Sequence, residues 1–186
     1  MLTVPVGHSL DLLNYVLGEF ADLSAVSDVR RPLITIEETG ERIVKTAADQ
    51  IAVIGTLASG ATASVHISEA VAGGTGFLWE INGTNGTLRI TADAAVPGIF
   101  PLTVAGARGR NEPAELAVPA ALTQKWPPLT SLEGAPAYNV GRVYAAFAAD
   151  IDNGTHSVSD FADAVRRHEV IAAIERSAAS GERVKA

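Results

Sequence analysis

The pattern of apolar residues near the start of the chain predicts a helix. Four apolar side chains recur at intervals of three or four residues, which places them on one helical face. The preceding Pro5, Val6 and Gly7 predict a break in the chain, so that the helix would start at His8. Gly18 predicts its end. The apolar positions are Leu10, Leu13, Leu17 and Phe20.

Between residues 50 and 93 the apolar pattern changes to a period of two, which is typical of half-buried β-strands. Ser59-Gly60 predicts a hairpin turn, and the Asn-Gly pairs at Asn82 and Asn85 predict a second one. An irregular polar segment, 31–49, precedes this region and is either a long loop or a loose hairpin. The predicted strands are 23–29, 50–60, 61–71, two within 76–93, 102–106 and 114–118.

Two helices are predicted to close the chain, at about 137–153 and 160–179. The first ends at Gly154, and the second begins at a capping Asp160 and ends at Gly181. The first of these helices carries an apolar stripe made of Val140, Val143, Tyr144, Phe147 and Ile151.

The order of these elements predicts an α+β fold with an open, mainly antiparallel sheet and helices packed on one face of it. The chain has 186 residues, enough for one domain with its own core, and we expect a single domain over residues 1–186. The strand at 61–71 predicts two different faces. Its apolar side is Ala63, Val65 and Ile67, and its polar side is Thr62, Ser64, His66 and Ser68. The polar side either faces solvent or meets a ligand, a second subunit or another domain.

Composition and charge remove several classes of partner. The chain has 14 Lys and Arg against 21 Asp and Glu, with a net charge of −7 and no dense basic cluster, so we expect no direct contact with nucleic acid. There is no cysteine, which excludes disulfides and thiol chemistry. No apolar run approaches the roughly 20 residues of a membrane span, and no signal peptide is visible. A cytoplasmic location is the default expectation.

The four histidines are the main candidates for chemistry: His8, His66, His156 and His168. His8 would combine a helix N-terminus with the nearby carboxylate of Asp11, an arrangement that suits proton transfer, although a simple cap-region role also fits. His156 falls in a loop and is expected to be solvated, and His168 is expected to be a hydrogen-bonded residue near the buried side of the last helix. No pair has metal-ligand spacing, so no metal site is expected.

No segment has the sequence of a nucleotide-binding loop. A glycine-rich phosphate cradle requires a strand, the GxGxxG turn and a helix in that order, and the glycine runs of this chain lie between predicted strands or lack a following helix. We therefore expect that this chain binds no cofactor by itself.

Three stretches together resemble a known family. These stretches resemble the C-terminal domain of the Gfo/Idh/MocA oxidoreductases, a dihydrodipicolinate-reductase-like fold. They are "GHSLDLLNYVLGEF", "WEINGTNGTLRI" and the segment 139–184, which begins "NVGRVYAAFAADIDNG". The resemblance covers nearly the whole chain and is weakest between Asp93 and Ala135. It implies a substrate-binding and dimerisation domain, acting on a sugar or polyol, that follows a Rossmann domain carrying NAD or NADP. That Rossmann domain is expected to be absent from this chain.

The resemblance also implies roles for individual residues. The family pattern around the first helix is roughly Asp-x-x-x-His-x-x-Asp, which His8 and Asp11 match, whereas Val4 occupies the first acidic position. It implies a catalytic and substrate-binding role for His8, facing the cleft toward the cofactor domain, and substrate binding for His66 on the polar face of the sheet. Because Val4 cannot serve in a proton relay, the sequence also resembles non-catalytic relatives similar to the fungal galactose-pathway repressor.

Three hypotheses follow. The chain is the substrate-binding domain of an NAD(P)-dependent sugar or polyol oxidoreductase, or the equivalent domain of a repressor-like, non-catalytic relative, or a free-standing ligand-binding or dimerisation module. In each case we expect a homodimer through the open sheet face, with strands 50–60, 61–71 and 77–90 in the interface.

Overall fold

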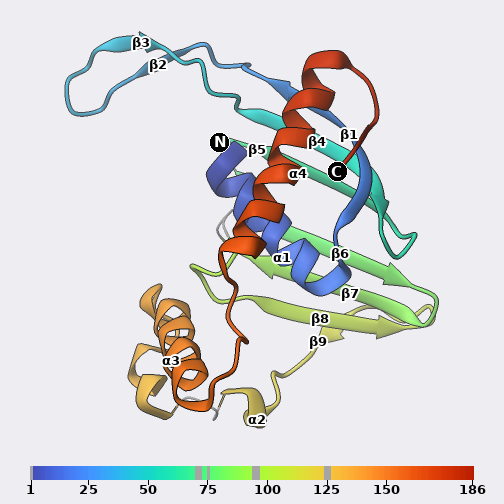
Figure 1. Ribbon diagram of the computed structural model, residues 1–186, viewed down its shortest axis with the longest axis vertical. Helices are drawn as coiled ribbons and strands as arrows, with labels where there is room; N and C mark the ends of the chain where they lie inside the picture. The colour runs from blue at the N-terminus through green and yellow to red at the C-terminus, as the bar shows by residue number, and fades with distance from the viewer. Residues whose placement is uncertain (1, 70–72, 75, 94–96, 124–126) are drawn as a thin grey trace. The chain divides into compact units, whose positions relative to one another are not determined.

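The computed structural model describes residues 2–69, 73–74, 76–93, 97–123 and 127–186 (Figure 1). They form two compact units, which are described separately. Unit 1 consists of Met1–Ala72 and Phe161–Ala186, and unit 2 of Gly73–Asp160. The strand expected over 61–71 ends at Ser68, and its last two expected residues lie outside the described residues.

Unit 1 combines the first third of the chain with its last helix. In chain order its elements are η1 (Leu2–Val6), α1 (Gly7–Leu17), β1 (Phe20–Asp28), β2 (Leu33–Thr35), β3 (Arg42–Val44), β4 (Gln50–Leu57), β5 (Thr62–Ser68), α4 (Phe161–Ser180) and β10 (Val184–Lys185). Four of the strands form an antiparallel sheet in the order β10-β1-β4-β5, and β2 and β3 form a separate hairpin.

The core of unit 1 lies between this sheet and the two helices α1 and α4. Helix α4 packs against β1, where the backbone N–H of Ala25 donates to Ser177 Oγ at 2.9 Å, and α1 packs against α4. Burial of these apolar side chains is the main stabilising contribution in the unit. The buried apolar residues of unit 1 are Val6, Leu10, Leu13, Phe20, Leu23, Ile51, Val53, Leu57, Val170, Ile171, Ala173 and Ile174.

The break expected before His8 is wrong. Residues Leu2–Val6 form a π-helical segment that continues directly into α1, and Val6 itself has helical dihedral angles, φ −69° and ψ −43°. Pro5 is tolerated because it falls among the first four residues of this helical stretch, whose N–H groups have no intrahelical acceptor. His8 therefore lies inside a continuous helical stretch rather than at its N-terminus. The predicted end is confirmed, since the N–H of Gly18 donates to Asn14 O at 2.9 Å.

Unit 2 contains a second antiparallel sheet, in the order β6-β7-β8-β9. Its elements are β6 (Phe77–Gly83), β7 (Gly86–Ala92), β8 (Thr103–Arg108), β9 (Ala114–Glu115), α2 (Ala120–Thr123), η2 (Pro127–Leu132) and α3 (Ala137–Asn153). The expected α+β class is confirmed, but the strands are divided between sheets instead of forming one. Both closing helices are confirmed within two residues of their predicted bounds.

The apolar stripe of α3 is real, but it is not buried. Each of its five residues is more than half exposed, from 53% for Phe147 to 70% for Tyr144. The apolar pattern therefore identified the helix, while the surface that it offers stays open in the described chain. On α4 the burial is unequal along the helix. Phe161 and Val165 are exposed, and the buried residues begin at Val170.

Candidate functional site

The first candidate site lies on the exposed side of the N-terminal helix. His8 is exposed on α1, and Val4, one turn earlier, is 60% exposed. Residues four apart on a helix lie on the same side, so a ligand that touches the imidazole ring would also reach the Val4 side chain. The site offers one titratable ring beside an apolar side chain.

Asp11 is held by an ion pair that the sequence did not indicate. Its carboxylate accepts a hydrogen bond from Nε of Arg167 on α4 at 3.1 Å. The Arg167 side chain is only 15% exposed, and its guanidinium also reaches the side-chain amide of Asn14, once the amide is oriented with its oxygen toward Arg167. Arg167 therefore links α4 to two turns of α1. Asp11 acts in fixing these helices, next to the surface that carries His8.

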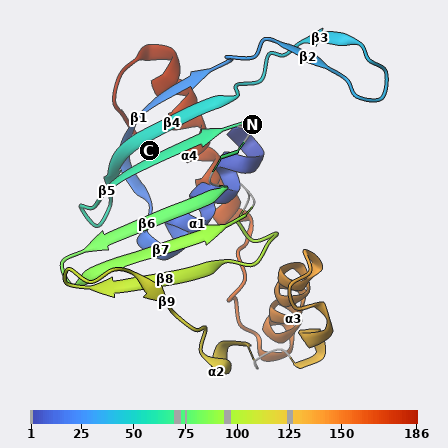
Figure 2. The same ribbon diagram turned by 180° about the vertical axis from the view of Figure 1, so that it is seen from behind.

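The second candidate site lies on the face of the unit 1 sheet that the helices leave uncovered. The cross-strand pairs Ile51–Ile67 and Val53–Val65 point toward the helices, because Ile51 and Val53 are buried. Side chains alternate along a strand, so the intervening residues point the other way. We call this other side the outer face, and Figure 2 shows its strands from behind. Its residues are Asp22, Ser24, Val26, Gln50, Ala52, Ile54, Thr56, Thr62, Ser64, His66 and Ser68.

His66 belongs to a small polar cluster on the outer face. Its Nε2 lies 3.3 Å from Gln50 Oε1 and 3.1 Å from Ser68 Oγ, and Ser68 Oγ donates to Gln50 Oε1 at 2.8 Å. The serine proton is thus used, which leaves two oxygen acceptors in front of Nε2 and favours a proton on that nitrogen. In the neutral ring, Nδ1 is then an acceptor for a ligand hydroxyl.

The two predicted site histidines do not come together within unit 1. His8 belongs to α1, which packs with α4 on the inner side of the sheet, whereas His66 projects from the outer face. They belong to two separate candidate sites. His156 is exposed in a loop, as expected. His168 is exposed as well, so its expected burial is wrong, although its Nδ1 does lie 2.9 Å from Ala164 O.

The outer face ends in a charged cluster where the C-terminal segment joins the sheet. Asp22 on β1 accepts from Arg183, whose Nε lies 3.0 Å away, and Arg183 Nη2 also donates to Thr56 Oγ1 at 2.7 Å. The hydrogen bond from Arg183 holds the pKa of Asp22 below its ordinary value. Between this cluster and the His66 cluster, Val26 and Ile54 are 63% and 56% exposed. The outer face therefore carries exposed apolar side chains between two polar clusters.

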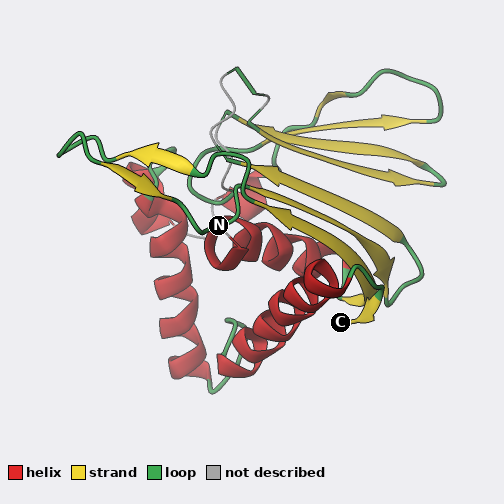
Figure 3. Ribbon diagram, turned by 90° about the horizontal axis from the view of Figure 1, so that it is seen from above, coloured by secondary structure: helices red, strands yellow, loops and turns green. Residues whose placement is uncertain are grey.

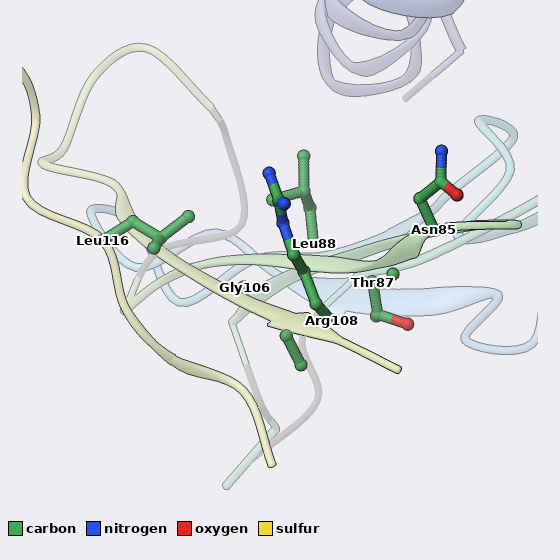
Figure 4. A pocket seen from close by; sticks show the side chains of 8 residues that line it. Asn85, Thr87, Leu88, Gly106, Arg108 and Leu116 are labelled. Carbon is green, nitrogen blue, oxygen red and sulfur yellow. The ribbon is translucent and has the colours of Figure 1, made fainter. Parts of the chain in front are cut away.

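Unit 2 contains a shallow groove over β7 and β8 (Figure 4). Its volume is about 380 Å³, and its floor is open because Gly106 has no side chain: a Cβ there would lie 2.8 Å from Leu116 Cδ1 and 3.2 Å from Leu88 Cδ2. Neither predicted site histidine lines it. The lining residues are Asn85, Gly86, Thr87, Leu88, Gly106, Ala107, Arg108 and Leu116.

Among the described residues, no three His, Asp or Glu side chains lie close enough together to hold a metal ion. Among the helices that the structure describes, none combines the length and the apolar character needed to cross a membrane.

The fold of this chain is shared with solved structures of sugar oxidoreductases and of a transcriptional regulator. The chain is similar to the Gal80(S2) super-repressor mutant of Gal80p from Saccharomyces cerevisiae, with a TM-score of 0.82, 20% identity, and coverage of 100% of this chain and 49% of that one. It is also similar to levoglucosan dehydrogenase in complex with NADH and L-sorbose (TM-score 0.76, 21% identity, 98% and 49% coverage).

The family comparison is more specific for the first part of the chain. Residues 1–92 match the family model described as Gal80p, C-terminal domain, and this stretch contains α1 and most of unit 1. A further similar structure is the transcriptional regulator Gal80p from Kluyveromyces lactis, with a TM-score of 0.72, 21% identity, and coverage of 99% of this chain and 45% of that one. The resemblance drawn from the sequence is thus confirmed for both groups of relatives.

The extent of these matches is limited in two ways. The chain spans about half the length of the solved structures to which it is similar. A search of curated proteins finds no match.

Proposed function

We propose that this chain is the substrate-facing and assembly domain of a two-domain protein of the Gfo/Idh/MocA type, which acts on a sugar or polyol. The observation that carries the proposal is the match of residues 1–92 to a C-terminal domain, combined with similarity over the whole chain to about half of each solved relative. A second half of similar size would then supply the nucleotide site.

In this proposal His8 has the chemical role. An exposed imidazole on a rigid helix can accept a hydrogen bond from a substrate hydroxyl and take up its proton. Asp11 does not compete for this role, because it is paired with Arg167. NAD or NADP would be held outside this chain, since no described segment has a glycine-rich strand-to-helix turn. The protein would act in the cytoplasm and without direct contact with nucleic acid.

The experiment uses the intact protein, with its nucleotide-binding half, and a panel of sugars and polyols. His8→Ala should lower turnover by about 10²–10⁴-fold, the usual scale for a lost general base, with little change in melting temperature. His156, in a loop, is also exposed, so His156→Ala is the matched control and should leave turnover unchanged. Equal effects of both substitutions would contradict the role of His8. His66→Ala tests the substrate-binding role of the other site: a raised KM at unchanged kcat is expected.

A second candidate function rests on Val4. The position that is acidic in the catalytic pattern is here an exposed valine, and two of the similar structures are Gal80p regulators. On this alternative the wild-type protein turns over no polyol, and His8→Ala changes only the affinity for a ligand. Val4→Asp distinguishes the two, because a carboxylate one turn before His8 would supply the missing relay partner. Activity gained by Val4→Asp alone would favour the regulatory alternative for the natural protein.

A further inference from the structure

The triplet Asn-Gly-Thr occurs three times in the chain, beginning at Asn82, Asn85 and Asn153. An asparagine before a glycine can lose its side-chain amide without an enzyme, because glycine has no side chain to keep its backbone nitrogen away from the asparagine Cγ. The next two residues are the same in all three triplets, and all three asparagines are exposed. The contacts that the fold makes around each asparagine therefore decide which of them reacts.

The side chain of Asn82 is held within strand β6. Its Oδ1 accepts a hydrogen bond from Thr87 Oγ1 at 2.8 Å, and Thr87 is its cross-strand partner on β7. Attack on Cγ of Asn82 requires this side chain to turn toward the nitrogen of Gly83, and the hydrogen bond must break first. The fold therefore protects Asn82.

Asn153 is held at both of the atoms that would have to move. Its Nδ2 donates to Ala149 O at 2.7 Å, at the end of helix α3. The backbone N–H of Gly154, which would supply the attacking nitrogen, donates to Asp150 O and closes the last turn of the helix. Both hydrogen bonds oppose cyclisation, so Asn153 is protected as well.

Asn85 lies in the two-residue turn, Thr84 and Asn85, that joins β6 to β7 at one end of the unit 2 sheet (Figures 1 and 3). No hydrogen bond of its side chain is found among the residues that the structure describes, and in Figure 4 its amide stands clear of the other labelled side chains. The next residue, Gly86, pairs with Gly83 in the last rung of the ladder. Opening this single rung at the end of a hairpin is enough to release the Gly86 nitrogen.

Packing fixes the glycine that follows Asn85. A Cβ on Gly86 would lie 2.1 Å from Ala107 O on the neighbouring strand β8, and a backbone oxygen in a ladder cannot move aside. The fold thus requires glycine at position 86. Susceptibility at this turn can be removed only by changing Asn85 itself.

We propose that Asn85 is a site of spontaneous deamidation in the folded protein. The backbone nitrogen of Gly86 attacks Cγ of Asn85, the new N–Cγ bond forms and the Cγ–Nδ2 bond breaks. Nδ2 leaves as ammonia with the proton from the Gly86 nitrogen. Water then opens the succinimide ring. Attack at Cγ breaks the new bond and gives aspartate, whereas attack at the main-chain carbonyl carbon breaks the original peptide bond and gives isoaspartate.

The two products have different effects on unit 2. Aspartate adds a negative charge to the groove that Arg108 also lines. Isoaspartate carries the backbone through Cβ and Cγ, which inserts one atom into the turn. Because Gly86 already lies against β8, the lengthened turn cannot keep both this contact and the rung to Gly83. The isoaspartate form, separated by ion exchange, should therefore melt at a lower temperature than the unmodified chain.

The test is incubation of the purified chain at neutral and at mildly alkaline pH, followed by mass spectrometry. Cleavage after Glu80 and Arg89 releases the fragment 81–89, in which Asn82 and Asn85 are compared within one peptide. Asn85 should deamidate roughly tenfold faster than Asn82 or Asn153, the scale that one or two protein hydrogen bonds give. The rate should rise with pH, because the attacking nitrogen must lose its proton. A folded chain in which Asn85 reacts no faster than the other two would overturn the proposal.

Two controls separate the fold from the local sequence. In concentrated urea the protecting contacts are lost and the three rates should converge. A preference for Asn85 that persists unchanged in urea would show that the fold does not select it, which contradicts the proposal.

Matched variants test the protecting contact directly. Asn85→Gln should abolish the reaction at this position, because the longer side chain would have to form a larger ring. Thr87→Val removes the hydroxyl that holds Asn82, so Asn82 should react severalfold faster while the rate at Asn85 stays the same. Asn82 that remains equally slow in Thr87→Val would contradict the role given to this hydrogen bond. Unchanged melting temperatures confirm that each variant is folded.

Discussion

The carboxylate of Asp11 lies 3.1 Å from Nε of Arg167, and this pair joins α1 to α4 although 156 residues separate the two in sequence. The two partners differ in environment, since Asp11 is 60% exposed and Arg167 15% at the side chain. The pair therefore leads to an asymmetric prediction.

Loss of Arg167 should cost more stability than loss of Asp11. Arg167→Met leaves the side-chain oxygen of the buried Asn14 without its donor, and we expect a loss of about 1–3 kcal/mol in the free energy of unfolding. Asp11→Asn removes only an exposed ion-pair partner and should cost about 1 kcal/mol or less. Urea denaturation of both variants measures the difference, and equal losses would contradict this assignment.

Gly55 should tolerate no side chain. A Cβ at this position would lie 2.2 Å from Asp22 O and 2.7 Å from Phe20 Cδ1, where the pairing of β1 with β4 shifts register. Because the backbone oxygen cannot move aside, we expect Gly55→Ala to destabilise unit 1 by about 1–3 kcal/mol or more. Gly83→Ala is the control, since its Cβ would meet its nearest atom at 3.7 Å. Thermal unfolding should separate the two variants clearly.

Acid should weaken unit 2 through Asp150. This buried carboxylate accepts from Thr155 Oγ1 at 2.6 Å and from both the N–H and the Oγ of Ser157. The hydrogen bond from Thr155 and these further donors lower the pKa of Asp150 from 3.8 to about 2. Because the folded pKa is depressed, the stabilisation is present above pH 4 and is lost as the pH falls from about 4 through about 2.

The measurement is a series of melting temperatures from pH 6 to pH 2. Asp150→Asn should melt at a lower temperature at pH 6, and the gap to the natural protein should narrow toward pH 2. Asp152→Asn, an exposed neighbour on α3, is the control and should follow the natural protein at every pH. A gap that stays constant with pH would exclude Asp150 as the source.

The outer face should support association of two copies. Ile54 is 56% exposed at its apolar centre, so Ile54→Glu would introduce a charge without disturbing the core. We expect at least a tenfold weaker self-association in sedimentation measurements and an unchanged melting temperature. Ala58→Glu, in the exposed turn after β4, is the control. Natural chain that sediments as a monomer of 19.3 kDa at high concentration would contradict this prediction.

The 186-residue chain by itself should not bind nicotinamide cofactors. No described segment offers the glycine-rich strand-to-helix turn that holds a pyrophosphate. Titration with NADH and with NADPH, followed by fluorescence, should show no saturation in the micromolar range. Saturable binding of either cofactor would locate a nucleotide site in this chain and would remove the need for a second domain.

Local pattern was sufficient for most elements and for the family resemblance. Both closing helices, the hairpin at Ser59-Gly60 and the alternation around His66 depend on neighbours in sequence, and all three are confirmed. The predicted helix start at His8 was wrong because Pro5 was interpreted as a break. A proline among the first residues of a helix removes no hydrogen bond. The burial expected for His168 was wrong because helical spacing identifies an apolar stripe but does not show how far along the helix the sheet covers that stripe.

The partners of the functional groups depend on tertiary contacts. Local periodicity and turn chemistry were enough to predict the element types, the polar side of the strand that carries His66 and the surface position of His156. They could not show that Arg167 binds Asp11, that Asp49 accepts from the backbone N–H groups of Arg30 and Arg31, or that α3 keeps an open apolar stripe. Those facts depend on residues brought together from distant parts of the chain, and a periodic pattern carries no information about which distant surface will meet it.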